Sequence, residues 1–185
     1  MSAASPELAL APVESWQQQL QGALRSPEAL ALALGLDVEA LPLAHASATQ
    51  FPLLVPRAFV ERMERGNPRD PLLLQVLCSA EEDATVPGFS PNPVGELDRY
   101  ADEPGLIQKY AGRALLVVTG QCAVNCRYCF RRHYPYGENA LSRAERLRQV
   151  DDLLADPGIG EIILSGGDPL LLADAELALI ADRLT

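Results

Sequence analysis

An α/β protein is predicted, with a helical N-terminal region followed by strand–helix units whose strands form a parallel sheet. Residues 115–184 alternate between strand-like and helix-like patterns, in the order strand, helix, strand, helix. Loops rich in cysteine or glycine follow both strand-like runs. Before about residue 105, the chain instead shows helix caps and prolines between short apolar runs. This order predicts right-handed βαβ connections, with active groups on the loops at the carboxyl ends of the strands.

The N-terminal region, residues 1–105, is expected to be helical and then extended. A serine is predicted to cap a helix over 16–24, and a Ser-Pro-Glu sequence opens a second helix that a glycine ends at residue 35. Prolines punctuate two short apolar helices within 51–77. The Pro/Gly-rich segment 81–105 is predicted to be a long ordered loop. We predict no chemistry in residues 1 to about 50, and a scaffold role for the helices within 51–77.

The second region, residues 106–185, is expected to hold the sheet. The apolar β-branched run ending at Thr119 predicts a buried strand, and a helix is predicted over 142–154. A short strand over 161–165 is followed by a turn and a last helix over 170–184.

Three of the four cysteines lie in the loop after the first strand, as Cys122, Cys126 and Cys129. Three thiolates spaced Cys-x3-Cys-x2-Cys suit a 4Fe-4S cluster with one iron left open for another ligand. A zinc site that recruits Cys78 or His133 is the alternative, although structural zinc usually has two separated cysteine pairs. Disulfides are disfavoured, because the cysteines crowd into one loop and the polar start of the chain does not resemble a signal peptide.

The net charge of −10 over 185 residues argues against nucleic acid as a partner, and no apolar run predicts a membrane span. A cytoplasmic location is expected. Between residues 104 and 137 there is no Asp or Glu. This window holds five basic residues, Lys109, Arg113, Arg127, Arg131 and Arg132. The positive charge is expected to surround anionic groups near the cysteines, and a solvated basic loop is the alternative.

The turn after the second strand reads Gly166-Gly167-Asp168. Two glycines and an aspartate make an ordinary strand-to-helix turn. Beside the cysteine loop, however, the same residues are interpreted as a ligand loop, because glycine lets a ligand approach the backbone and Asp168 can accept hydrogen bonds from an ammonium group.

Several longer motifs resemble one family. They are Phe-Pro-Leu-Leu-Val-Pro at 51–56, Gly-Asn-Pro-Arg-Asp-Pro at 66–71, Asn-Pro-Val-Gly-Glu at 92–96, Cys-Arg-Tyr-Cys-Phe-Arg-Arg-His at 126–133 and Ser-Gly-Gly-Asp-Pro-Leu at 165–170. Together they resemble the lysine 2,3-aminomutase family of radical S-adenosylmethionine (SAM) enzymes, from about residue 49 onward, and most closely its branch that makes (R)-β-lysine for elongation factor P. Gln108 and Asn92 depart from the His and Asp that the family usually has.

The resemblance implies a role for each motif. Cys122, Cys126 and Cys129 would bind the 4Fe-4S cluster, whose open iron chelates SAM for reductive cleavage to a 5'-deoxyadenosyl radical. The methionine amino group of SAM would meet Gly166, Gly167 and Asp168. Arg131 would pair with the substrate carboxylate. The phosphate of pyridoxal phosphate would lie near Lys109, Tyr110 and Arg113.

The resemblance also implies a reaction, the migration of the amino group of free L-lysine from C2 to C3, and an electron donor such as flavodoxin or ferredoxin. A homo-oligomer is compatible with it. The family's (β/α)6 barrel has about six units, and this sequence contains two. Its single lysine, Lys109, matches a phosphate contact and not the Schiff-base lysine. We therefore expect an N-terminal fragment with no catalytic residue of its own, inactive alone; a non-catalytic remnant and a zinc-stabilised binding module are the alternatives.

Overall fold

The computed structural model describes residues 14–41, 43, 45–97 and 103–184. The prediction that no signal peptide is present rests on residues 1–13, which lie outside the described residues. The elements, in chain order, are α1 (Trp16–Gln21), α2 (Pro27–Leu34), η1 (Val38–Ala40), α3 (His45–Gln50), α4 (Arg57–Val60), α5 (Pro71–Leu74), η2 (Ala80–Asp83), β1 (Leu106–Ile107), β2 (Arg113–Thr119), α6 (Arg143–Ala155), β3 (Glu161–Gly166), η3 (Pro169–Leu171) and α7 (Asp174–Leu184).

The sheet is mixed and has three strands in the order β1-β2-β3. β2 and β3 are parallel, as predicted, with Leu116 opposite Leu164. The short strand β1 was not predicted; it pairs antiparallel with β2. It is held there because the Val117 amide donates to the Gly105 carbonyl at 2.7 Å. A two-residue strand carries too little alternation to be recognised in the sequence.

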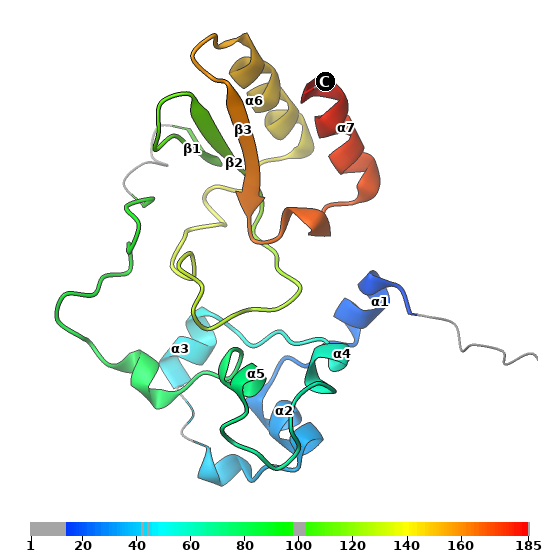
Figure 1. Ribbon diagram of the computed structural model, residues 1–185, viewed down its shortest axis with the longest axis vertical. Coiled ribbons are helices and arrows are strands. Elements are labelled where there is room, and N and C mark those ends of the chain that lie inside the picture. Colours follow the sequence, from blue (N-terminus) through cyan, green and yellow to red (C-terminus); the bar gives the residue numbers. More distant parts are fainter. Residues whose placement is uncertain (1–13, 42, 44, 98–102, 185) are drawn as a thin grey trace, which may run out of the picture.

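The helices α6 and α7 cover one face of the sheet (Figure 1). The alternate residues Leu116 and Val118 of β2 point into this layer and pack with Val150 and Ile180 of the helices. The other face carries Leu115 and Val117 of β2, together with Ile163 and Ser165 of β3. Only a small cluster with Ile107, Tyr134 and Val117 at its centre packs there. The more open face is therefore the one available to ligands.

The last helix begins later than predicted. The expected helix over 170–184 is divided into η3 and α7, because Leu172 has an extended backbone (φ −63°, ψ 150°) and lies buried in the core. Asp168 caps η3 by accepting a hydrogen bond from the Leu170 amide at 3.0 Å. At this break the chain gives up helical hydrogen bonds, and the apolar side chain of Leu172 is buried instead.

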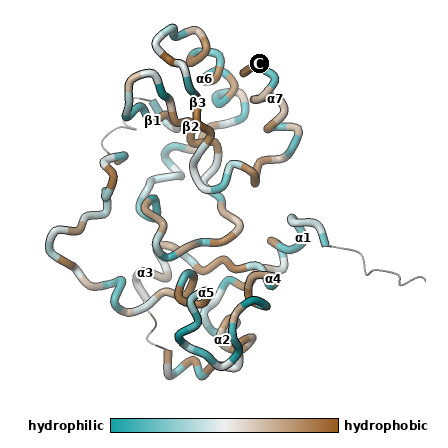
Figure 2. The backbone as a smooth tube through the Cα atoms, in the orientation of Figure 1, coloured by the Kyte–Doolittle hydropathy of each residue, from teal (hydrophilic) through white to brown (hydrophobic). Residues whose placement is uncertain are grey.

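The N-terminal helices form a separate hydrophobic core. Ser15 and Ser26 cap α1 and α2 as predicted, and Gly35 ends α2 with a φ of 69°. The core contains ten buried residues, Leu24, Leu30, Leu34, Leu53, Val55, Val60, Met63, Leu73, Val76 and Leu77. Figure 2 shows hydrophobic stretches in two places, among these helices and along β2 and β3.

The loop between β2 and α6 joins the two cores. Its first part, residues 120–133, is called the cysteine loop below, and the helical region that it contacts comprises residues 16–83. Figure 1 shows the loop running from the carboxyl end of β2 down to α3 and α5. Within the described ranges, no helix is both long and apolar enough to cross a membrane.

Candidate functional site

Hydrogen bonds hold the cysteine loop against the helical region. The Asn125 amide donates to the Leu54 carbonyl at 3.1 Å, and its side-chain amide donates to the Pro52 carbonyl at 2.9 Å. The Arg127 amide donates to the Gln75 carbonyl at 2.6 Å. Proline-rich segments for which the sequence indicated no chemistry therefore fix the path of the loop.

Glu82 forms an ion-pair cluster with two arginines of the loop. Its carboxylate accepts hydrogen bonds from Arg127 Nε at 3.0 Å and Nη2 at 2.6 Å, and from Arg132 Nη1 at 2.6 Å. The Arg127 and Arg132 side chains are 7% and 15% exposed. Burial opposes the charge of Glu82, but hydrogen bonds from the two arginines outweigh it, so the pKa of Glu82 is lowered.

This cluster changes the interpretation of the acid-free window. Arg127 and Arg132 pair with Glu82, Arg131 pairs with Glu96, and Arg113 pairs with Glu161. The expected excess of positive charge around the cysteines is therefore largely balanced by acids from outside the window. The prediction counted only charges close in sequence, whereas folding brings glutamates that are 35 to 50 residues away.

Replacing Glu82 by glutamine is expected to destabilise the fold by about 3 kcal/mol, because two buried guanidinium groups lose their counter-charge. The measurement is the free energy of unfolding in urea. Glu81→Gln is the matched control, since Glu81 is the exposed neighbour in the same short helix. Equal unfolding free energies for the two variants would show that the cluster does not hold the loop.

The three cysteines of the loop are free thiols of intermediate burial. Burial, with smaller contributions from the neighbouring Cys129, Asp168 and Cys126, raises the pKa of Cys122 to about 11. Cys122 therefore lies within electrostatic reach of both other cysteines and of Asp168. Its thiol also lines a cavity of about 350 Å³ between the loop and α1.

This donor set fits an iron–sulfur cluster. In the part of the chain that the structure describes, no three His, Cys, Asp or Glu side chains are arranged to hold a single metal ion. A 4Fe-4S cluster does not need that arrangement, because each cysteine binds a different iron atom. Of the two alternative zinc ligands, Cys78 is buried in the helical region at 3% exposure, whereas His133 is the last residue of the cysteine loop and its Nδ1 lies 2.8 Å from Gln50 Nε2.

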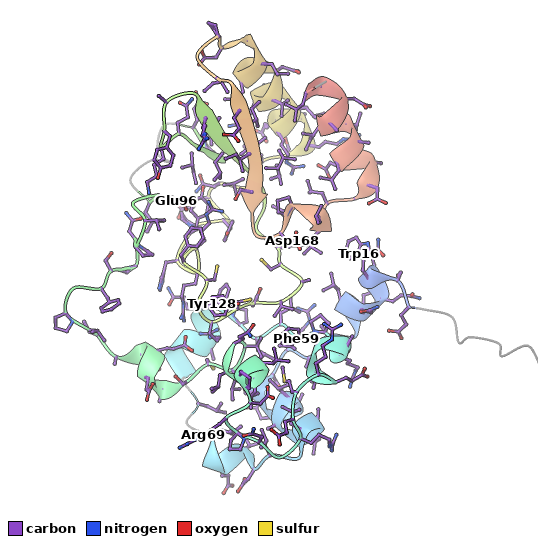
Figure 3. The ribbon with its side chains drawn as sticks, viewed as in Figure 1. Trp16, Phe59, Arg69, Glu96, Tyr128 and Asp168 are labelled. Carbon is purple, nitrogen blue, oxygen red and sulfur yellow. The ribbon has the colours of Figure 1, made fainter. Side chains whose placement is uncertain are left out.

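The Gly-Gly-Asp turn, residues 166–168, joins the start of the cysteine loop through backbone hydrogen bonds. The Gly167 amide donates to the Thr119 carbonyl at 2.8 Å, and the Asp168 amide donates to the Gln121 carbonyl at 2.7 Å. Gly166 has a φ of 122°. Figure 3 shows Asp168 just past the carboxyl end of β3. These hydrogen bonds join two segments that lie far apart in the sequence, because the paired residues are 48 and 47 positions apart.

Arg131 lies next to this turn, but it is already engaged. Its Nε and Nη2 donate to the two oxygens of Glu96 at 2.7 and 2.8 Å, and its Nη1 donates to Ser165 Oγ at 2.6 Å. Burial lowers the pKa of Arg131, but the hydrogen bond and charge of Glu96 outweigh this effect and the pKa is raised. The fork of N–H groups that was predicted to bind a substrate carboxylate faces a carboxylate of the protein.

Lys109, Tyr110 and Arg113 all line a cavity of about 140 Å³. Glu96 and Ile163 also line this cavity. The three residues precede or begin β2, whereas the cysteines follow it, so the two groups lie at opposite ends of the strand. Arg113 pairs with Glu161 at 2.5 Å, and Lys109 donates to the Val94 carbonyl.

Two glutamates to which the sequence interpretation gave no role, Glu82 and Glu96, organise the site. Both lie in the segment predicted to be a loop. Glu96 ends the Asn-Pro-Val-Gly-Glu motif at 92–96, but the motif does not indicate its partner, and nothing in the local pattern distinguishes Glu82 from a surface acid. Asn92 stands where the family usually has aspartate, and its hydrogen bond shows why either residue is suited to this position. Its side-chain oxygen accepts a hydrogen bond from the Leu97 amide at 3.1 Å, which an aspartate oxygen could equally accept. Gln108 is exposed, and nothing in the structure explains its difference from histidine.

Residues 116–184 match the family model of the Radical SAM superfamily. The matched residues include most of β2, the cysteine loop, α6, β3, the Gly-Gly-Asp turn and α7, so this part of the chain belongs to a radical SAM domain. Within this class, the chain is homologous to L-lysine 2,3-aminomutases.

Three such relatives cover about nine-tenths of the chain. Proteins named L-lysine 2,3-aminomutase from Escherichia coli, Haemophilus influenzae and Buchnera aphidicola are 48%, 42% and 36% identical to it. The matches cover 89%, 92% and 93% of this chain, and 48%, 50% and 51% of the respective relatives. The chain therefore spans about half the length of the curated relatives that it matches.

Proposed function

We propose that this chain provides the cluster-binding and SAM-binding part of a radical SAM isomerase that converts L-α-lysine to (R)-β-lysine, for attachment to elongation factor P. The main support is the pair of backbone hydrogen bonds that joins the cysteine loop to the Gly-Gly-Asp turn. Cys122, the first of the three thiols, is within electrostatic reach of Asp168 in this turn, to which we assign the amino acid part of SAM. Homology to L-lysine 2,3-aminomutases supports the choice of reaction.

We further propose that the sheet begins a (β/α)6 barrel, with residues 106–185 as the start of the core domain and residues 1–105 as the preceding helical region. Among the described strands, β3 pairs on one side only, with β2. Its other edge can accept a further parallel strand. Ile163 on the open face of the sheet is 41% exposed, as expected of a residue that further units would cover.

The Gly-Gly-Asp turn is suited to an ammonium group. The amides of Gly167 and Asp168 already donate to the cysteine loop, and the Gly166 and Asp168 carbonyls accept from Arg131 and the Leu171 amide. The acceptor that the turn presents to a ligand is therefore chiefly the Asp168 carboxylate, of which Oδ1 also accepts from the Leu170 amide. An ammonium group is a pure donor. Cys122, Cys126 and Cys129 would hold the 4Fe-4S cluster, which together with SAM supplies the radical chemistry.

The cavity lined by Lys109, Tyr110 and Arg113 is the proposed place for the phosphate of pyridoxal phosphate. The Arg113 and Glu161 side chains are 61% and 50% exposed, so their ion pair contributes little and a phosphate can replace Glu161. Since Lys109 is the single lysine of the sequence, no second lysine is present for a Schiff base. The 185-residue chain alone is proposed to be inactive as an aminomutase.

Anaerobic reconstitution with iron and sulfide tests the proposal. We expect about four iron atoms and four sulfides per chain, a brown colour and a reduced-cluster spin spectrum that changes when SAM is added. A colourless protein would contradict the assignment. One zinc ion per chain without labile sulfide would instead support the zinc-stabilised binding module.

A further inference from the structure

Glu96 and Arg131 form one of the most buried ion pairs among the described residues. Their side chains are 10% and 8% exposed, and both carboxylate oxygens engage the same guanidinium group. The third nitrogen, Nη1, donates to Ser165 Oγ at 2.6 Å and approaches the Gly166 carbonyl at 3.4 Å. A single arginine thus links a glutamate of the long loop to the end of β3.

The loop that carries Glu96 is itself fixed. Between residues 92 and 97, Asn92 accepts hydrogen bonds from the Leu97 amide at 3.1 Å and from the Gly95 amide at 3.3 Å. The side chain of Lys109, which lies between β1 and β2, donates a hydrogen bond to the Val94 carbonyl. Glu96 therefore projects from a braced loop toward the segment between β2 and α6 (Figure 3). A braced carboxylate can hold a buried guanidinium in one orientation.

We propose that Glu96 is a positioning residue for SAM binding, which acts through Arg131 to hold the Gly166–Asp168 turn in place. This inference rests on the proposed function, because that function assigns the turn to SAM. Glu96 fixes the guanidinium, the guanidinium holds Ser165 and Gly166, and these residues lead directly into Gly167 and Asp168. While Glu96 is bound, Arg131 cannot offer the same pair of N–H groups to a substrate carboxylate.

The variant Glu96→Gln breaks this linkage in a defined way. An amide presents one acceptor and one donor, so its NH2 group would face a guanidinium that has only donors. Arg131 would keep its buried charge without a counter-charge, and would turn toward other acceptors. Glu96→Asp keeps the charge but is one methylene shorter, so it should retain part of the effect. Glu138→Gln is the matched control, an exposed glutamate in the segment between β2 and α6 that also carries Arg131.

The test measures two quantities on the chain, as the wild type and the three variants. The first is the dissociation constant for SAM of the anaerobically reconstituted protein, by equilibrium dialysis, with iron and sulfide determined on each sample. For Glu96→Gln we expect about tenfold weaker binding at unchanged iron content. Glu96→Asp should fall between it and the wild type, and Glu138→Gln should match the wild type.

The second quantity is hydrogen exchange of the Gly167 and Asp168 amides without any cofactor. These amides donate to the Thr119 and Gln121 carbonyls. In Glu96→Gln their exchange should rise about tenfold more than that of the α6 amides, whose change reports the general loss of stability from the unpaired Arg131 charge. A rise of equal size in α6 would show a general loss of stability and would overturn the positioning role.

The results separate the two hypotheses. If the wild type takes up no cluster or does not bind SAM, the proposed function fails, and the role of Glu96 toward SAM fails with it; faster exchange at Gly167 would then show only a structural link. If the wild type binds SAM and Glu96→Gln binds it equally well, the role of Glu96 is overturned while the proposed function stands.

Discussion

Replacing Gly167 by alanine is expected to separate the Gly-Gly-Asp turn from the cysteine loop and to destabilise the fold by about 3 kcal/mol or more. A Cβ atom at this position would lie 2.1 Å from the Gln121 carbonyl oxygen and 2.5 Å from its carbon. Both are backbone atoms, so no side chain can rotate away to make room. The hydrogen bonds from Gly167 and Asp168 to the loop would be lost together.

The measurements are the free energy of unfolding in urea and the iron content after reconstitution. Gly137→Ala is the matched control, because a Cβ atom at Gly137 would meet nothing within 4 Å and its φ is not positive. That variant should be as stable as the wild type or slightly more stable. A Gly167→Ala protein with wild-type stability and iron content would refute the close contact between the two segments.

Serine at any one of Cys122, Cys126 or Cys129 is expected to remove most of the cluster. Iron should fall from about four atoms per chain to near zero, because a cluster with two thiolate ligands is poorly held and the serine hydroxyl is a harder ligand. The measurements are iron and labile sulfide per chain and the visible absorption of the reconstituted protein.

Cys78→Ala is the control for this series. Cys78 is buried in the helical region, and its replacement should cost less than about 2 kcal/mol of stability and leave the iron content unchanged. If Cys78→Ala loses the cluster while one of the three loop variants keeps it, Cys78 is a cluster ligand and the cysteine replaced in that loop variant is not. Loss of bound zinc in the loop variants, without any change in sulfide, would support a zinc site.

Much of the fold could be predicted because its signals are local. The serine caps of α1, α2 and α6, the β-branched run of β2 and the glycine that ends α2 depend on residues within one or two turns of one another. The same holds for the candidate site. The cysteine spacing and the Gly-Gly-Asp turn are short motifs, and their placement at neighbouring strand ends followed from the strand–helix order.

The sequence by itself determined the order of the main helices and of the strands β2 and β3, the cysteine motif and the class of chemistry. Only the tertiary structure decided how the charges of the site are satisfied. Glu82 and Glu96 reach Arg127, Arg132 and Arg131 across 35 to 50 residues, and no periodicity or motif connects them in the sequence. The reason is physical. A buried charge needs a counter-charge within a few ångströms in space, and its distance along the chain does not enter that requirement.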